Sequence, residues 1–320
     1  MFCFDFFNTD TLWDVFCRFY NIDREFAKPL ITAAVQQKNP VLFFLRQTKL
    51  TLDRISVEDV FLHCRHITTT HDSLESLSRY GLLTLNDALS KGTDLRNFLT
   101  ENKVEVDVEH MIFTFNGQSI YLHDYSSDCL ECYYGECKYQ KYQWNGNVDI
   151  EYKNDMCNFR EMTRSLSLKL YHCKGEIEVH LAGDTHAMHN YSCVKRWPEI
   201  LETINKLIND IYKENLALTS KWEKQHNKKY YCLSFDVNIK DFEYITAGKK
   251  YEKQYYYSYL DFCQNQYNDL PEGDKNFYGN VYLLSNSIST LAGNRITDYG
   301  AILPSVQIPY ESLSIEQFNL

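Results

Sequence analysis

The chain has 320 residues, of which 44% are hydrophobic and 24% charged, so it can bury a core and is not intrinsically disordered. Its net charge of −10 argues against a protein that coats nucleic acid through phosphate contacts. The apolar run from Val41 to Leu45 is too short for a membrane span, and no basic region precedes the apolar N-terminus as in a secretory signal. We therefore expect a cytoplasmic protein with no membrane partner.

The first fifty residues predict helices. Thr9 and Asp10 can cap a first helix, and Pro29 suits the first turn of a second helix that runs through 31–35. The apolar side of the first helix has helical spacing and carries Leu12, Trp13, Phe16 and Phe19.

A strand-to-helix unit follows. Residues 61–68 are β-prone and predict a strand, and Asp72 with Glu75 three residues later resembles the capping box that starts a helix. Gly81 suits the C-terminal end of that helix. Two further short helices are expected at 85–89 and 95–99.

The middle of the chain predicts hairpins. Asn116-Gly117 separates the β-prone segments 111–115 and 119–122, and Asn145-Gly146 predicts a second hairpin over 142–150. Another strand is expected at 177–181.

The clearest helix is expected at 198–212, and the helical spacing of its apolar residues is expected to continue to Trp222. Strands are then predicted at 230–237 and 281–284. A last strand is expected at 301–309, with a short helix after it.

The most informative stretch is Arg65-His66-Ile67-Thr68, followed by a short helical segment that ends in Tyr80-Gly81-Leu82. This pattern resembles the opening of ADP-ribosyltransferases of the DarT-like and diphtheria-toxin-like kind. The resemblance implies that His66 binds the nicotinamide-side ribose of NAD, that Thr68 lines the nicotinamide pocket, and that Tyr80 and Gly81 belong to the cofactor site. The alternative is a surface histidine in a strand-to-helix turn.

The end of the chain also resembles this family, whose domains end in a late strand and an Ile-Pro turn. In this sequence the turn is Ile308-Pro309. The family's catalytic Glu opens that strand, but this chain has Gly300-Ala301 there. Three charged residues bracket the strand: Asp298 and Glu311 as candidate catalytic carboxylates, and Arg295 as a candidate pyrophosphate ligand. The alternative is that all three are solvated surface charges.

Together these patterns predict an α+β fold with mixed and antiparallel sheets, and the resemblance implies a split ADP-ribosyltransferase-like core with a large central insertion. The expected divisions are 1–104 for N-terminal helices and the first part of the core, 105–227 for a hairpin-rich and helical insertion, and 228–320 for the strands that complete the core.

The chain contains 11 cysteines, an odd number that favours reduced thiols over a disulfide framework. Cys129, Cys132 and Cys137 have the spacing of half a zinc site, and Cys157 or His123 could supply a fourth ligand. Such a zinc would be structural. The alternative is a set of unligated thiols in a β region.

Asp184, His186 and His189 form a third candidate, because Asp and His at this spacing can ligate a metal that activates water. A complete hydrolase site needs more carboxylates than this segment supplies, and the alternative is a polar loop. Serine-nucleophile, P-loop and dinucleotide-dehydrogenase signatures are absent from the sequence.

The resemblance implies transfer of ADP-ribose from NAD to a macromolecule, protein or nucleic acid, as in bacterial toxins or phage-defence effectors, with a neutralising or regulatory protein as a further partner. The rival interpretation is a non-catalytic protein-binding module whose acidic, tyrosine-rich surface binds a partner and whose cysteine cluster staples the insertion.

Overall fold

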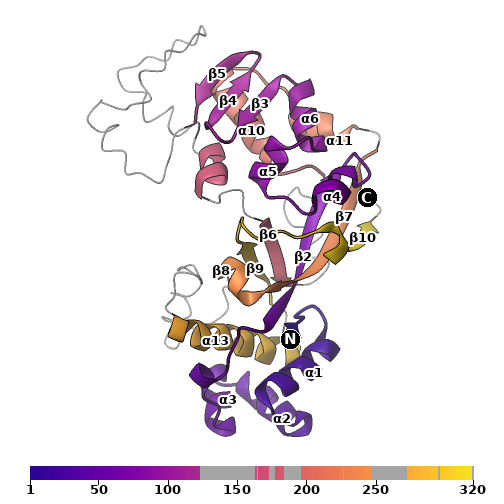
Figure 1. The fold of residues 1–320 in the computed structure, drawn as a ribbon. Helices are drawn as coiled ribbons and strands as arrows, with labels where there is room; N and C mark the ends of the chain where they lie inside the picture. Colours follow the sequence, from indigo (N-terminus) through magenta and orange to yellow (C-terminus); the bar gives the residue numbers. More distant parts are fainter. Residues whose placement is uncertain are drawn as a thin grey trace, which may run out of the picture.

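The computed structural model describes residues 1–122, 163, 165–172, 177–183, 196–225, 227–246, 272–294 and 296–318. A group of helices lies at one end of the molecule, a central sheet in the middle, and a smaller sheet with its own helices at the other end (Figure 1). The predicted α+β class with mixed and antiparallel sheets is confirmed.

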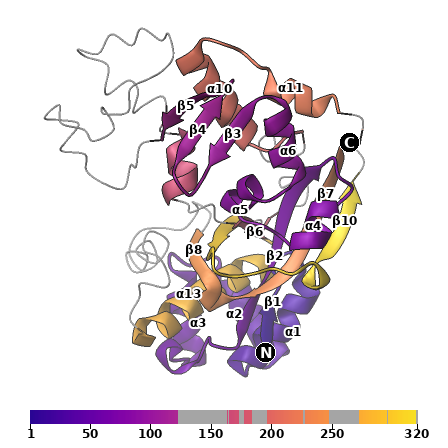
Figure 2. The same ribbon diagram turned by 45° about the horizontal axis from the view of Figure 1, so that its top comes forward.

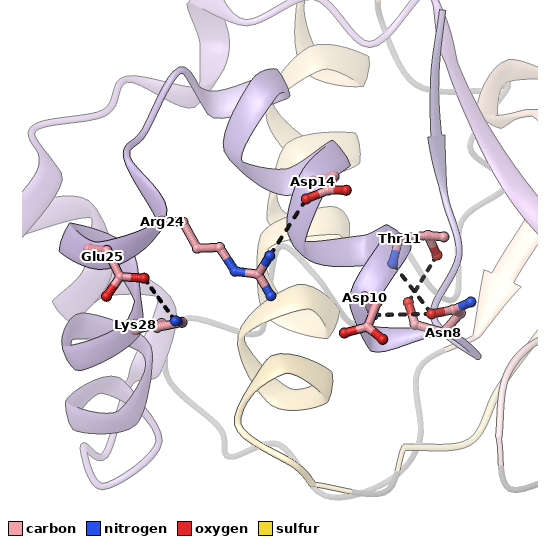
Figure 3. A network of polar contacts seen from close by, with 7 residues as sticks. All are labelled: Asn8, Asp10, Thr11, Asp14, Arg24, Glu25 and Lys28. Atoms are coloured by element: carbon pink, nitrogen blue, oxygen red, sulfur yellow. Dashed lines mark hydrogen bonds and ion pairs between the residues drawn. The ribbon is translucent and has the colours of Figure 1, made fainter.

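The N-terminal segment forms three helices, α1 (Thr9–Tyr20), α2 (Arg24–Ala34) and α3 (Pro40–Thr48). The cap of α1 is Asn8, one residue before the predicted cap. Its Oδ1 accepts hydrogen bonds from the backbone N–H groups of Asp10 at 3.0 Å and Thr11 at 3.3 Å (Figure 3). The side chain of Asn8 therefore satisfies two of the N–H groups that a helix start leaves without a partner.

Helix α2 begins earlier than predicted, at Arg24 rather than at Pro29. The side chain of Asp23 caps it by accepting from the N–H groups of Glu25 and Phe26. Pro29 lies inside the helix, where its nitrogen cannot donate to the carbonyl oxygen of Glu25 and its ring crowds that carbonyl. An exposed ion pair joins Arg24 to Asp14 of α1 at 3.6 Å (Figure 3).

Seven strands make the central sheet: β1 (Phe2–Phe4), β2 (Val60–Thr70), β6 (Ile177–Ala182), β7 (Lys229–Asn238), β8 (Phe242–Thr246), β9 (Asp298–Ile302) and β10 (Ser314–Phe318). Their order is β10-β7-β2-β6-β9-β8, and β1 pairs in parallel with β2. Strand β2 pairs with β7 from Phe61 to Thr70 but with β6 only at Arg65↔His180. Beyond Arg65, therefore, β2 and β6 separate.

One face of this sheet packs on the helices at the N-terminal end of the molecule. Helix α13 (Glu272–Leu291) crosses beneath the sheet beside α1 and α3 (Figure 1). The buried cluster between them includes Phe4, Phe16, Phe44, Leu62, Leu233, Phe235 and Tyr282. The amide of Asn280 ties α13 to the 3₁₀ turn η1 (Leu52–Arg54), since it donates to the carbonyl oxygens of Leu52 and Ile55.

The prediction of a strand at 281–284 was wrong, because these residues lie in the middle of α13. Val281, Tyr282, Leu283 and Leu284 are all buried. A helix that is buried on all sides carries a continuous apolar run, and such a run cannot be told from a buried strand by its periodicity.

The smaller sheet and its helices form a second packing unit. Its sheet is a meander of β3 (Val104–Asp107), β4 (Ile112–Phe115) and β5 (Gln118–Tyr121), and the turn Asn116-Gly117 joins β4 to β5 as predicted. The helical elements are α5 (Leu85–Ser90), α6 (Asp94–Glu101), a π-helical turn at Leu168–His172, α10 (Ile200–Tyr212) and α11 (Leu218–Glu223). Figure 2 shows α10 lying against β3, β4 and β5.

The two packing units do not follow the expected divisions of the chain. The second buried cluster already includes Leu89 and Phe98, which precede residue 104, and β6 belongs to the central sheet although it lies within 105–227. Residues 105–227 therefore contribute to both units. Helix α10 ends at Tyr212, where Lys213 adopts a left-handed conformation, and α11 is a separate helix.

The end of the chain also differs from the prediction. Strand β9 stops at Ile302, and the chain then turns, forms the 3₁₀ turn η6 (Tyr310–Ser312) and ends in β10 instead of a helix. Strand β10 pairs with β7, so the sheet edge decides its conformation. Among the described helices, none has the length and apolar character needed to cross a membrane.

Candidate active site

A cavity of about 340 Å³ lies where β2 and β6 separate. Part of its polar lining comes from the C-terminal half of β2, including His66, Thr68 and Thr70, and charged residues outside β2 also line it. Its apolar lining comes from the segment after β2, from α5, α6 and α11, and includes Leu74, Leu77, Leu82, Leu85, Leu95 and Trp222. The cavity therefore has an apolar wall facing a row of strand side chains, which is the usual composition of a small-molecule site.

His66 is fixed by a hydrogen bond across the fork between the strands. Its Nδ1 lies 2.8 Å from the backbone carbonyl oxygen of Glu178 in β6. A carbonyl only accepts, so Nδ1 carries a hydrogen, and in the neutral ring Nε2 is an acceptor. Burial lowers the pKa of His66 below its ordinary value, and the bond to Glu178 opposes this shift. The ring is therefore neutral at pH 7, with an acceptor nitrogen available to a ligand hydroxyl.

Helix α4 (Glu75–Tyr80) carries the chain from β2 to the opposite wall of the cavity, and Gly81 ends it. Gly81 has φ 74° and ψ −167°, a backbone conformation that is essentially restricted to glycine. A Cβ at this position would lie 2.3 Å from the carbonyl oxygen of Ile308, and the same carbonyl accepts from the N–H of Leu82 at 2.9 Å. The Tyr-Gly-Leu turn is thus docked directly on the Ile-Pro turn.

Two carboxyl groups meet around one hydroxyl beyond Thr68. Thr70 Oγ1 lies 2.5 Å from Asp72 Oδ1 and 2.7 Å from Asp94 Oδ2. Asp72 also accepts from the N–H groups of Leu74 and Ser76 and from the Ser76 hydroxyl, while Asp94 accepts from the N–H of His71 at 3.0 Å. One hydroxyl hydrogen cannot serve both carboxylates at once.

The protein environment shifts the pKa values of the two carboxyl groups in opposite directions. Burial acts to raise the pKa of Asp72, but the hydrogen bonds from Ser76, Thr70 and the backbone outweigh it, and the pKa is lowered. Burial raises the pKa of Asp94, which its own hydrogen bonds only partly offset. Asp72 is therefore the fixed negative charge of the cavity, and Asp94 is the carboxyl that is protonated first on acidification.

A second cavity of about 280 Å³ lies on the other side of these carboxyl groups. Asp72, Ser76 and Asp94 line both cavities, and most other residues of the second are polar or charged, including His71, Glu75, Arg79 and Tyr80. The pair of carboxyl groups thus forms the partition between an apolar and a polar chamber.

The structure brings together some of the residues that the sequence nominated. His66, Thr68 and Gly81 line the first cavity, and Tyr80 lines the second, where the guanidinium of Arg79 lies 5.1 Å from its ring centroid. Arg295, Cys129, Cys132, Cys137 and Cys157 lie outside the described residues, as do His123, Asp184, His186, His189 and the hairpin expected at 142–150.

Asp298 and Glu311 do not line either of these two cavities. Asp298 is 1% exposed, and its carboxylate accepts a hydrogen bond from Asn286 of α13. Glu311 is exposed on η6. Asp298 is the first residue of β9 and Glu311 follows that strand, but β6 lies between β9 and β2, which keeps β9 from pairing with the strand that carries His66.

Asp94 and Trp222 were not predicted as site residues, and Asp72 was predicted only as a helix cap. Asp94 opens α6 and Trp222 lies in α11, so neither is near His66 in the chain. The only local signal is the polar run Thr70-His71-Asp72 directly after a strand, and strand ends are common positions for ligand-binding side chains.

Comparison of the chain with protein-family models, with curated proteins and with solved structures finds no match.

Proposed function

We propose that the chain is an ADP-ribosyltransferase-like protein that binds NAD⁺ in the cavity lined by His66 and transfers ADP-ribose to a macromolecule. One observation carries the proposal. The two segments on which the resemblance rests, His66 to Leu82 and Ile308-Pro309, lie far apart in sequence but meet through the hydrogen bond between Leu82 and Ile308, beside one cavity.

The chemistry of the cavity supports this proposal. In the reaction, the bond between C1′ of the ribose and the nicotinamide nitrogen breaks, and its electron pair leaves with neutral nicotinamide. The acceptor forms a bond to C1′ and gives up a proton. Nε2 of neutral His66 can accept a hydrogen bond from a ribose hydroxyl and so orient the sugar. Orientation of the reacting groups supplies much of the rate enhancement in such a reaction.

A negative charge near C1′ would stabilise the developing cation. Of the carboxyl residues that line the cavity, Glu199 is paired with Lys169 at 3.0 Å, and Glu178 belongs to the opposite face of the sheet by its register. Asp72 remains as an ionised group, with Asp94 beside it as a proton acceptor or donor. In this proposal Asp72 takes the place of the carboxylate that the family has at the position of Gly300-Ala301.

The test is calorimetry of the purified chain with NAD⁺, followed by chromatography for released nicotinamide. We expect His66→Ala to weaken NAD⁺ binding about tenfold, as expected for the loss of one hydrogen bond and its orienting effect. His110→Ala is the matched control, because His110 is an exposed histidine whose bond to Asp107 lies on the smaller sheet. Absence of binding and of nicotinamide release by the wild type would favour the non-catalytic protein-binding module.

A further inference from the structure

We propose that the indole N–H of Trp222 donates a hydrogen bond to the carboxamide oxygen of nicotinamide, which makes Trp222 a specificity-determining residue of the cavity. The inference rests on the proposed function, since it assigns one end of NAD⁺ to one end of the cavity. In addition to the contact of His66 with NAD⁺, it assigns a contact with NAD⁺ to α11, a helix of the second packing unit.

The first observation is a buried donor with no acceptor. Trp222 is 1% exposed and lines the first cavity, and its Nε1 is buried without a hydrogen-bond partner among the described residues. An indole N–H can only donate, and buried Trp side chains normally find an acceptor for it. A bound ligand with an acceptor atom at this position would supply the missing partner.

The second observation is that the indole is held in place. The ring of Phe98 packs edge-on against it at a centroid distance of 5.0 Å, and the ring of His71 does so at 4.2 Å. Both ring nitrogens of His71 are also buried without a partner in the described part of the chain. His71 lines the second cavity and not the first, so its role here is to pack against the indole, and an indole held rigidly places its donor at a defined point of the first cavity.

The charges around Trp222 select the nicotinamide end of NAD⁺ over the phosphates. Asp72 and Asp94 line the same cavity, and the N–H of His71, next to the indole, is bonded to Asp94. Burial and the nearby Lys228 lower the pKa of His71 to about 4, so its ring brings no positive charge at pH 7. The carboxyl groups of Asp72 and Asp94 would repel a pyrophosphate, and the cation near His71, Lys228, interacts with the carboxylate of Glu223. The pyridinium ring of NAD⁺ is cationic and its carboxamide is a neutral acceptor, so this end of NAD⁺ suits the two carboxyl groups.

The shape and polarity of the wall agree with a flat ring. Leu74, Leu77 and Leu95 supply apolar surface around the carboxyl groups. A planar aromatic group with one polar substituent can bury its faces against such leucines while the substituent reaches a fixed donor.

The experiment compares Trp222→Phe with wild type by calorimetry, using NAD⁺ and ADP-ribose as probes. ADP-ribose lacks nicotinamide. We expect the variant to bind NAD⁺ about tenfold more weakly and ADP-ribose with unchanged affinity. Trp197→Phe is the matched control, because the indole N–H of Trp197, a partly buried residue that lines neither cavity, already donates to Glu202 at 2.9 Å.

Equal NAD⁺ affinity in Trp222→Phe and wild type would overturn the inference while leaving the proposed function intact, as would an equal loss for both probes. If wild type binds neither probe, the inference and the proposed function both fail. A second measurement does not depend on folding of the variant: with ¹⁵N-labelled indoles, NAD⁺ should shift the Trp222 N–H signal, assigned through its proximity to the His71 ring, and ADP-ribose should leave it in place.

Discussion

At the scale of single residues, the protonation state of His66 sets the pH range in which a ligand can bind. Its Nδ1 donates to Glu178 in either state, so only the neutral ring offers Nε2 as an acceptor. Because the pKa of His66 is lowered, we expect NAD⁺ affinity to stay constant from about pH 8 to 6.5 and to fall on further acidification. Calorimetry across this range tests the expectation. His66→Ala should give a flatter profile, and identical profiles for the two proteins would contradict the role of Nε2.

Asp72 is expected to act mainly on turnover. Asp72→Asn removes the negative charge and keeps one side-chain oxygen, which can accept from the N–H of Leu74 or of Ser76 but not from both. We expect nicotinamide release to slow by about 10²-fold, with a smaller change in NAD⁺ affinity, as when one electrostatic group is removed from an active site. Kinetics with melting temperatures in parallel separate this effect from unfolding. If Asp72→Asn lowers the melting temperature enough to account for the slower turnover, Asp72 acts only as the cap of α4.

His180 is a buried histidine of β6 whose titration should appear in the stability of the protein. Burial, with His66 nearby, lowers its pKa to about 4, and Tyr299 packs against its ring at 4.9 Å. Since the unfolded chain takes up the proton near pH 6.5, the stability that neutral His180 contributes is fully present above that pH and is lost as the pH falls toward 4. We expect His180→Gln to remove on the order of 3 kcal/mol of this pH dependence.

The measurement for His180 is urea unfolding of wild type and His180→Gln at several pH values between 4 and 7. The difference between the two proteins isolates His180 from the other titrating groups. Parallel stability curves over this range would show that His180 does not titrate as its burial implies.

At the scale of elements, the end of α4 shows how a local motif and a distant segment depend on each other. Gly81→Ala would place a methyl group against the Ile308 carbonyl and force a residue with a side chain into the backbone conformation of Gly81. We expect a loss of about 2–4 kcal/mol in the free energy of unfolding and weaker ligand binding, because the turn forms a wall of the cavity.

Gly92→Ala is the matched control for Gly81→Ala. A Cβ at Gly92 would meet no atom within 4 Å, so its effect should stay within about 0.5 kcal/mol. Denaturant unfolding of both variants tests this pair. If both variants lose the same free energy of unfolding, the close contact between Gly81 and the Ile308 carbonyl does not stabilise this wall of the cavity.

At the scale of the whole molecule, the described residues form two large buried clusters, and residues of both line the cavity. One cluster joins the central sheet to α1, α2, α3 and α13, and the other joins α10 and α11 to the smaller sheet. His66 belongs to the sheet of the first unit, while Trp222 belongs to the second cluster. A ligand that contacts both should therefore couple the stability of the two units.

Ile204→Ala tests this division. Ile204 is fully buried in α10, and its truncation should cost about 2–5 kcal/mol within the second unit. Hydrogen exchange should then accelerate in α10, α11 and the smaller sheet, with the central sheet still protected. Leu62→Ala, which truncates a fully buried residue of the first cluster, should give the opposite pattern. Uniform acceleration in both variants would mean that the chain unfolds as one cooperative unit.

Local chemistry made several elements predictable from the sequence. Asn116-Gly117 supplies two positive φ angles and so determines the turn between β4 and β5, and the apolar stripe of α10 has an unambiguous helical period. The strand with His66 and Thr68, and the helix that ends at Gly81, were predicted because each signal lies within a few residues. Side chains alternate along a strand, so His66 and Thr68 share one face of β2, and Thr70, which lies beyond the predicted end of the strand at residue 68, shares it too.

Contacts between distant segments decided the rest. Burial on all sides made 281–284 helical in spite of its β-prone residues, and the free edge of β7 made the C-terminal segment a strand. The sequence by itself determined that His66 and Thr68 share a strand end before a glycine-terminated helix. Only the tertiary structure placed Asp94 and Trp222 at the same cavity and Asp298 outside it, because strand order and helix packing, and not spacing along the chain, decide which side chains meet.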